Sequence, residues 1–205
     1  AGIRALADYG LAHQGPALWR EQLQGIVRSQ DRASRLVDQL LALALADEAR
    51  GAPALHAVAP DALVQRIVLR AMPRADAAGV DLGAQGLDDA VSVQGDEALL
   101  EGALQNLLDN ALRYGRPTDG SPARVTVALA RDALGVTLSV IDNGPGIAAP
   151  DRERLVERWQ QGGEGKRLGE GSGLGLAIVS RYAQLLGAEL SIQRGPQGVG
   201  ASVSL

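Results

Sequence analysis

The sequence predicts an α+β protein in which a helical hairpin over residues 1–50 precedes an α/β domain over residues 51–205. The first observation is one amphipathic pattern over residues 18–48, in which apolar positions alternate spacings of four and three. The second is a helix-breaking stretch from Gly51 to Pro53. The third is that strand-like and helix-like segments alternate after this break, which is typical of helices packed on a sheet.

The amphipathic pattern forms a heptad seam on a helix of about 31 residues, which is roughly 46 Å long. The helix before it ends at the turn signal Gln14-Gly15-Pro16 and has only about 13 residues. Because so short a partner cannot bury the whole seam, dimerisation into a four-helix bundle is the favoured interpretation, and an intramolecular hairpin is the alternative. The seam residues are Trp19, Leu23, Ile26, Gln30, Ala33, Val37, Leu40 and Ala44.

Periodicity predicts the elements of the α/β domain in chain order. The predicted helices are 60–72, 96–114 and 172–186, and the predicted strands are 80–82, 91–93, 124–130, 136–142, 189–193 and 201–205. Turn signals at Leu134-Gly135 and at residues 195–198 join the last four strands into two hairpins. A glycine-rich, charged stretch over residues 144–171 lies between a strand and a helix, where ligand-binding lids occur.

Composition excludes several classes of protein. Hydrophobic residues make up 46% of the chain and there is no phenylalanine, so we expect a core of Leu, Val, Ile and Ala. The net charge of −4 is spread along the chain, which gives no footprint for nucleic acid. The absence of cysteine excludes disulfides and thiolate zinc sites, and two isolated histidines do not form a metal cluster.

The N-terminus has no signal-peptide architecture, and the sequence has no apolar stretch of the roughly 20 residues that a membrane span requires. The chain also begins without methionine inside a helical pattern. We therefore expect a soluble fragment of a longer protein.

Asn106 and Asn110 lie four residues apart on the helix predicted for 96–114, at the flank of its apolar face. A carboxamide offers a carbonyl oxygen to a hard cation and, unlike glutamate, cannot accept a proton. The pair can therefore hold a metal and phosphates without activating water. Alone, two asparagines at this spacing are more often a solvated helix edge. Arg113 and Tyr114 favour a site, because they add a phosphate partner and a ring that can stack on a base.

Asp142 stands where a predicted strand ends and the turn Asp142–Ile147 begins. A half-buried carboxylate there can accept a hydrogen bond from the exocyclic amine of adenine. The alternative is an ordinary capped β-turn, because Asp-Asn-Gly-Pro-Gly is favourable turn chemistry by itself.

Glycines spaced two apart, from Gly169 to Gly175, precede the apolar start of the helix predicted for 172–186. Glycines let backbone N–H groups approach phosphate oxygens, and a helix N-terminus favours negative charge. The pattern fits neither the dinucleotide fingerprint nor a P-loop, so it indicates an anion cradle of another kind.

In chain order these motifs resemble the ATPase domain of bacterial sensor histidine kinases, a family that shares its fold with DNA gyrase, the chaperone Hsp90 and the mismatch-repair protein MutL. Residues 106–115 look like the family's N box, 142–147 its G1 box and 169–175 its G2 box, while 35–44 is similar to the second helix of its dimerisation domain. The resemblance implies a two-layer α/β sandwich that binds ATP and Mg2+. It also implies a homodimer through the helical stem, transfer of the γ-phosphoryl group to a stem histidine, and relay to the receiver domain of a cognate response regulator. The chain would then be the cytoplasmic part of an inner-membrane sensor.

The resemblance also implies residue roles. Asn110 would coordinate Mg2+, Asn106 would help to hold metal and phosphates, and Asp142 would bind the adenine amine. Arg113 would contact phosphate and Tyr114 would lie against adenine. The other predicted ATP-binding residues are Gly144, Gly146 and Ile147 of the turn and Gly171, Ser172, Gly173, Leu174 and Gly175 of the cradle. Lys166, in a lid over about 148–171, is either a contact of the γ-phosphate or a solvated side chain, and with Asn106 it completes the predicted catalytic set.

Two departures from the family pattern matter. The lid has Val156 and Trp159 where the family usually has phenylalanine, so it keeps the apolar character of the family's lid without its residues. No phosphoacceptor box of the His-Glu-Leu-Arg-Thr-Pro-Leu type is present, and His13 and His56 lack an acidic neighbour, so we expect both to be structural. We accordingly expect the chain to start just after that box, and to bind ATP without phosphorylating itself.

Two alternatives remain. The first is a hydrolytic ATPase of the gyrase and Hsp90 type. In the family resemblance, such enzymes have a glutamate that activates water at the place of Asn106, so hydrolysis by this chain should be slow. The second is a non-catalytic dimer scaffold with a decayed nucleotide site. Both asparagines, Asp142 and the glycines are intact, which is evidence against decay.

Overall fold

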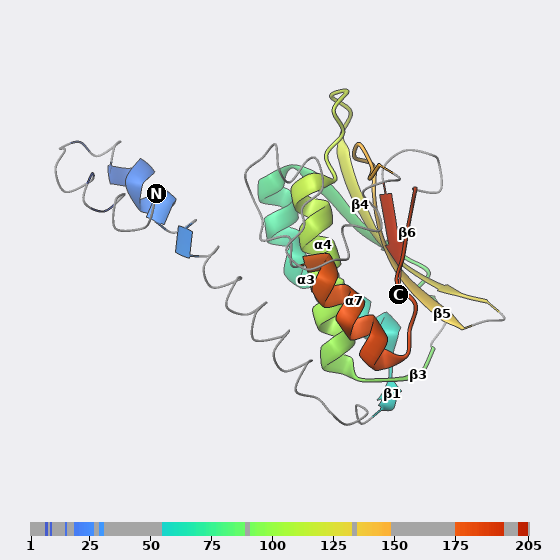
Figure 1. Cartoon of the computed structure of the whole chain (residues 1–205). Helices are drawn as coiled ribbons and strands as arrows, with labels where there is room; N and C mark the ends of the chain where they lie inside the picture. Colours follow the sequence, from blue (N-terminus) through green and yellow to red (C-terminus); the bar gives the residue numbers. More distant parts are fainter. Residues whose placement is uncertain are drawn as a thin grey trace. The chain divides into compact units, whose positions relative to one another are not determined.

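A five-stranded mixed sheet and the helices packed on it belong to the second of two compact units, which are Ala1–Leu45 and Ala46–Leu205 (Figure 1). This computed structural model describes residues 7, 9, 15, 19–26, 29–30, 55–88, 91–132, 135–148, 175–194 and 201–204. In the first unit, residues 19–26 and 29–30 are helical. Half of the predicted heptad seam, from Ala33 to Ala44, lies outside the described residues, so the hairpin and its dimerisation stay predictions. No helix in the described part of the chain is both long and apolar enough to cross a membrane.

The strand order of the sheet is β2-β4-β5-β7-β6. β2 (Val80–Gln85) runs parallel to β4 (Ala123–Arg131), which is antiparallel to β5 (Val136–Asp142). β7 (Ala201–Ser204) lies between β5 and β6 (Ser191–Arg194) and is antiparallel to both. The two predicted hairpins are confirmed, since β4 pairs with β5 and β6 with β7.

A separate two-stranded sheet joins β1 (His56–Val58) to β3 (Val93–Gly95). The strand predicted at 91–93 is thus displaced by two residues, because its pairing partner and not its local pattern fixes its position. His56 is exposed on β1, opposite Gly95.

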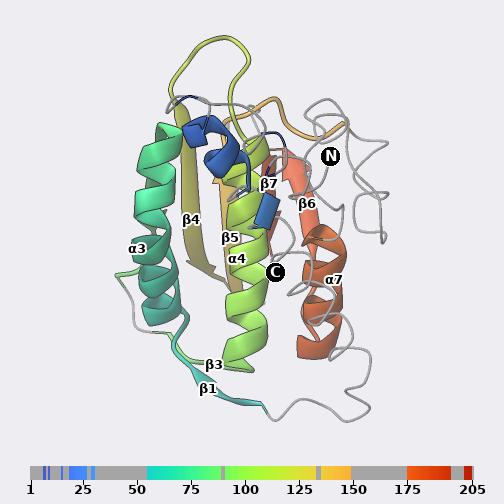
Figure 2. The same ribbon diagram turned by 90° about the vertical axis from the view of Figure 1, so that its left-hand side faces the viewer.

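Three helices lie side by side over one face of the sheet, with α4 (Glu97–Tyr114) between α3 (Pro60–Ala78) and α7 (Gly175–Leu186) (Figure 2). In β2, β4 and β5, alternate residues such as Leu82, Val125 and Val140 are buried beneath these helices. The largest fully buried side chains include Leu63, Leu104, Leu108, Ile178, Val125 and Val127. The predicted two-layer α/β sandwich is confirmed, and its core consists mainly of Leu, Val, Ile and Ala.

Helix α4 begins at Asp96, whose carboxylate accepts hydrogen bonds from the N–H groups of Ala98 at 2.9 Å and Leu99 at 3.1 Å. This cap satisfies two N–H groups that have no partner inside the helix. The apolar residues at 100, 103, 104, 107, 108 and 111 are all buried, as the periodicity predicts. Asn106 and Asn110 consequently lie half-buried at the flank of that face.

Helix α3 continues to Ala78, so the predicted end at residue 72 is wrong. Pro73 lies inside the helix and is exposed, while the buried stripe continues beyond it to Ala75. A proline removes one helical hydrogen bond, and here burial on the opposite face outweighs that loss. The helix ends instead at Gly79, whose φ of 64° is in the left-handed region.

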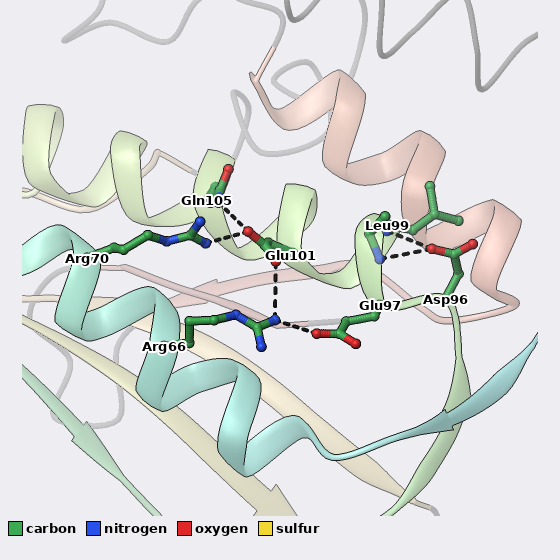
Figure 3. Close-up of polar contacts among 8 residues, drawn as sticks. Arg66, Arg70, Asp96, Glu97, Leu99, Glu101 and Gln105 are labelled. Atoms are coloured by element: carbon green, nitrogen blue, oxygen red, sulfur yellow. Dashed lines mark hydrogen bonds and ion pairs between the residues drawn. The ribbon is translucent and has the colours of Figure 1, made fainter.

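Ion pairs link the outer surfaces of α3 and α4 (Figure 3). Arg66 pairs with Glu97 and Glu101, and Arg70 also pairs with Glu101. Nearer the C-termini of both helices, Nη1 of Arg74 lies 2.8 Å from a carboxylate oxygen of Asp109. We call these six residues the interhelical ladder.

Candidate functional site

The N-terminus of α7 lies against the two asparagines of α4. A Cβ atom on Gly175 would lie 3.2 Å from Nδ2 and 3.3 Å from Oδ1 of Asn110, and 3.6 Å from Oδ1 of Asn106. A residue without a side chain is required for this approach unless Asn110 moves. The fold therefore brings together Gly175, Asn106 and Asn110, three residues that the sequence assigns to one site from two separate motifs.

A hydrogen bond to its own helix orients the carboxamide of Asn106. Its Nδ2 donates to the backbone oxygen of Gly102 at 2.8 Å, and Oδ1 is the atom of Asn106 nearest to the Cβ position of Gly175. Sequence reasoning did not identify Gly102 or its neighbour Tyr182. A Cβ atom on Gly102 would lie 2.7 Å from Cε2 of Tyr182, a buried residue of α7 whose pKa is raised by desolvation. Helices α4 and α7 thus touch at Gly102 and Gly175, and Asn106 lies between these two points.

The second part of the site is the turn that follows β5. Asp142 is half-buried, and its Oδ1 accepts a hydrogen bond from the N–H of Gly144 at 2.9 Å. Gly146 has a φ of 75°, which favours glycine at that position. Part of the predicted turn chemistry is therefore present, and the carboxylate lies at the end of the strand, as predicted.

This turn packs directly on the C-terminus of α4. A Cβ atom on Gly144 would lie 2.6 Å from the carbonyl carbon of Gly115, and one on Gly115 would lie 2.5 Å from Cβ of Asp142. Gly115 has a φ of −82°, which any residue adopts, so close approach and not backbone conformation requires glycine there. Two successive motifs of the sequence, the asparagine helix and the aspartate turn, therefore meet through two glycines.

Asn143 fastens the turn to the neighbouring strand, a role that sequence reasoning did not assign. Its Oδ1 accepts from the N–H of Arg124 at 2.7 Å, and its Nδ2 donates to the backbone oxygen of Pro122 at 2.9 Å. Its own N–H donates to the backbone oxygen of Arg124 at 3.2 Å. The available signal was the tendency of asparagine in turns to bond backbone groups.

Of the remaining predicted site residues, some are described by the structure and others are not. The guanidinium carbon of Arg113 lies 6.0 Å from the centroid of the Tyr114 ring, and both residues belong to the last turn of α4. Ile147, the last residue of the turn, is half-buried. Lys166, Gly171, Ser172, Gly173, Leu174 and nearly all of the predicted lid are outside the described residues.

These contacts give the site two chemically different ends along α4. At one end are two carboxamides and a helix N-terminus, which suit a cation and an anion held together. At the other end is a half-buried carboxylate, which suits an N–H donor. Asn110 and Gly115 are separated by about 7.5 Å along the helix axis, so the arrangement suits an elongated ligand with an amine at one end and phosphates at the other.

Residues 95–205, more than half of the chain, match the family described as histidine kinase-, DNA gyrase B- and HSP90-like ATPase. The sensor protein kinase PmrB of Pseudomonas aeruginosa is 30% identical over 205 residues, which cover 100% of this chain and 42% of PmrB. The sensor protein QseC of Salmonella typhi is 36% identical over 168 residues, 82% of this chain and 35% of QseC. The chain thus spans less than half the length of these relatives.

Solved structures agree with the fold. Full-length ShkA, crystallised in complex with AMPPNP, has a TM-score of 0.73 at 24% identity, over 100% of this chain and 45% of ShkA. The mycobacterial sensor histidine kinase MprB has a TM-score of 0.58 at 27% identity, over 73% of this chain and 94% of that structure. The chain therefore belongs to the histidine kinase-, DNA gyrase B- and HSP90-like ATPase family.

Proposed function

We propose that this chain holds Mg-ATP between α4, α7 and the turn after β5, and that the longer protein transfers the γ-phosphoryl group to a histidine of its helical stem. The contact of Gly175 with Asn106 and Asn110 is the observation that carries this proposal. It joins the predicted phosphate cradle to the predicted metal-binding helix. Phosphoryl transfer depends mainly on positioning and on charge neutralisation, which such a site supplies.

The adenine end of the proposed site is the turn Asp142–Ile147. The carboxylate of Asp142 would accept a hydrogen bond from the exocyclic amine of adenine, and the ring of Tyr114 would lie against the base. Gly144, Gly146 and Ile147 would line the same end. The half-burial of Asp142 supports this assignment, since partial removal from water strengthens a hydrogen bond to a charged acceptor.

The phosphate end combines Asn106, Asn110, Arg113 and the amides from Gly171 to Gly175, with Lys166 of the lid as a candidate contact of the γ-phosphate. Mg2+, when bound, would neutralise phosphate charge and is assigned to the carbonyl oxygen of Asn110. An amide oxygen is a suitable hard ligand, because Mg2+ keeps few protein ligands and takes others from substrate phosphates. The missing side chain of Gly175 supports the fit, because a Cβ atom would fill the space beside Asn110.

Transfer to a histidine is favoured over hydrolysis by the chemistry of position 106. A carboxamide cannot take a proton from water, and the Nδ2 of Asn106 is directed to the oxygen of Gly102. An ATPase of the gyrase and Hsp90 type is therefore the less favoured alternative, and a non-catalytic dimer scaffold is a third. We further propose that the whole protein is a homodimer through its stem, with this part in the cytoplasm, and that it phosphorylates a response regulator receiver domain.

Calorimetric titration with Mg-ATP tests the binding site. Asn110→Ala and Asp142→Asn should each weaken binding by tenfold or more, about 1.4 kcal/mol or above. Gln105→Ala is the matched control, because Gln105 is a carboxamide on the same helix that donates to Glu101 instead, at 3.0 Å. Equal affinities for all four proteins would rule out the proposed site.

A longer form that includes a stem phosphoacceptor histidine tests the activity. With γ-labelled ATP it should acquire acid-labile phosphate, and Asn110→Ala should abolish the label. The present chain should stay unlabelled and hydrolyse ATP slowly. Steady turnover at the rate of a dedicated ATPase would favour the hydrolytic alternative.

A further inference from the structure

We propose that Asn143 is a positioning residue, which sets the place of the Asp142 carboxylate and through it the preference of the site for adenine. The inference rests on the proposed function, because it takes Asp142 to be the group that accepts the adenine amine. Asn143 itself is assigned no contact with the ligand.

The first argument is the number and kind of its bonds. The oxygen and the nitrogen of the Asn143 carboxamide, and its backbone N–H, all bond backbone groups of Pro122 and Arg124, at 2.7, 2.9 and 3.2 Å. Pro122 directly precedes β4 and Arg124 is its second residue, and β4 is the neighbour of β5 in the sheet. A side chain with an acceptor and a donor at this spacing is required to make the two side-chain bonds together.

The second argument is the position of Asn143 in the strand register. Asp142 faces Val125 in the final pair between β5 and β4, and the chain leaves the sheet directly after it. Without a further anchor, the last residue of a strand frays with the turn that follows. The bonds of Asn143 extend the attachment by one residue, so Asp142 is held by sheet pairing on one side and by Asn143 on the other.

The third argument is that the end of α4 packs closely against the other side of the turn. Gly115 of α4 approaches so closely that an added Cβ atom would lie 2.5 Å from Cβ and 2.7 Å from Cγ of Asp142. Gly144 also lies close to Gly115, because a Cβ atom on Gly144 would lie 2.6 Å from the carbonyl carbon of Gly115. This packing prevents the turn from moving toward α4, and Asn143 tethers it to β4. Together they leave the carboxylate little freedom, and such preorganisation raises affinity by lowering the ordering cost of binding.

Adenine preference provides the readout, because guanine has a carbonyl where adenine has its exocyclic amine. A well-placed carboxylate accepts from the amine and repels the carbonyl. Loss of position should therefore weaken Mg-ATP more than Mg-GTP. A general loss of stability should weaken both nucleotides together and lower the melting temperature.

The experiment measures the Kd of Mg-ATP and Mg-GTP for the full chain carrying Asn143→Ala, Asn143→Asp, Asp142→Asn, or Asn143→Ala with Asp142→Asn. For Asn143→Ala we expect about a tenfold weaker Kd for ATP and less than about a twofold change for GTP. Asn143→Asp keeps the acceptor for the Arg124 N–H and should retain part of the preference. In the Asp142→Asn background, Asn143→Ala should have no further effect on ATP, since residues that act through one another are not additive.

Arg124→Ala is the matched control. It removes the side chain whose Nε lies 3.1 Å from Asp81 but keeps the backbone groups that Asn143 uses, so both affinities should stay at the wild-type values. Equal weakening of both nucleotides by Asn143→Ala, or full additivity with Asp142→Asn, would overturn the inference while leaving the proposed function intact. If Asp142→Asn alone leaves ATP binding unchanged, the adenine assignment itself is wrong and the inference falls with it.

Discussion

Gly146 and Gly175 are glycines for different physical reasons. Gly146 has a left-handed φ of 75°, which strains any residue with a Cβ atom. At Gly175, as at Gly115, space is the reason, because a side chain would meet atoms of the site. The two kinds of glycine should therefore respond differently to substitution. At Gly146 the cost is in backbone conformation, and at Gly175 it is in the position of Asn110.

Gly175→Ala should weaken Mg-ATP binding while leaving the fold intact. The new Cβ atom would lie 3.2 Å from Nδ2 of Asn110, which must then shift by a few tenths of an ångström. We expect the Kd to rise about three- to tenfold, equivalent to roughly 0.6–1.4 kcal/mol. Calorimetric titration measures this, and Gly83→Ala is the control, since nothing lies within 4 Å of its Cβ position. Wild-type affinity of Gly175→Ala would show that α7 moves away from Asn110 when nucleotide binds.

At the residue scale, sequence analysis predicted side chains with intrinsic chemistry and missed residues that act by shape. Asn106 and Asn110 stand out by their spacing of four, and Asp142 by its place where a strand ends and a turn begins. Gly102 and Tyr182 carry no such signal, since their contact exists only when α4 and α7 are packed. Asn143 was visible as a turn residue, but its partners in β4 are nineteen positions or more away and depend on the sheet register.

At the scale of elements, the interhelical ladder holds α3 beside α4 on the outer surface of the helical layer, and Figure 3 shows the part around Glu101. Glu101 occupies its centre, with contacts to Arg66 and Arg70. The hydrogen bond from Arg70 is the main cause that lowers the pKa of Glu101, against the opposing effect of desolvation. A carboxylate that is stabilised in this way in the folded state makes stability depend on pH.

Glu101→Gln should destabilise the protein at neutral pH but not in acid. Because the folded pKa is lowered, the stabilisation is fully present above the unfolded pKa of about 4.3 and disappears as pH falls through the folded value. The side chain of Glu101 is 26% exposed, so solvent screening limits the effect to within about 1 kcal/mol. Urea unfolding between pH 7 and pH 3 measures the difference, with the exposed Glu189→Gln as control. A difference that persists unchanged at pH 3 would mean that packing, and not charge, is the cause.

Local pattern predicted the existence of the elements better than their ends or their order. The burial of α4 follows its sequence period, and its cap at Asp96 is a local signal. The end of α3 does not follow from Pro73, because the tertiary contacts of Ala75 lie beyond that residue. The parallel pairing of β2 with β4 joins segments far apart in the chain, and no local period encodes such a choice.

For the whole molecule, the site contacts described above belong to the second unit, Ala46–Leu205. The resemblance of the sequence to a family predicted this architecture as a whole, whereas periodicity alone predicted only its segments. The fold also explains why the motifs are scattered. α4, the end of β5 and the start of α7 meet at one place, although they are separate in the sequence.

Residues 46–205 alone should bind Mg-ATP with the affinity of the full chain, to within about twofold. The contacts that join Asn106, Asn110, Asp142 and Gly175 to their surroundings lie inside this segment. Calorimetric titration of both proteins makes the comparison, with Asn110→Ala in the shorter protein as a control for specific binding. A Kd more than tenfold weaker for residues 46–205 would show that the first unit contributes to the site.

The position of β7 also bears on how the protein is made. β7 pairs Ser202, Val203 and Ser204 with residues 139–141 of β5, directly before Asp142. Synthesis proceeds from the N-terminus at about 5–20 residues per second, so β7 follows β5 by roughly 3–12 s. During that interval β5 has β4 on one side only and presents unpaired N–H and C=O groups on the other, where another nascent chain can pair with it. The strand that ends at Asp142, the residue proposed to bind adenine, therefore keeps one unpaired edge until β7 has been synthesised.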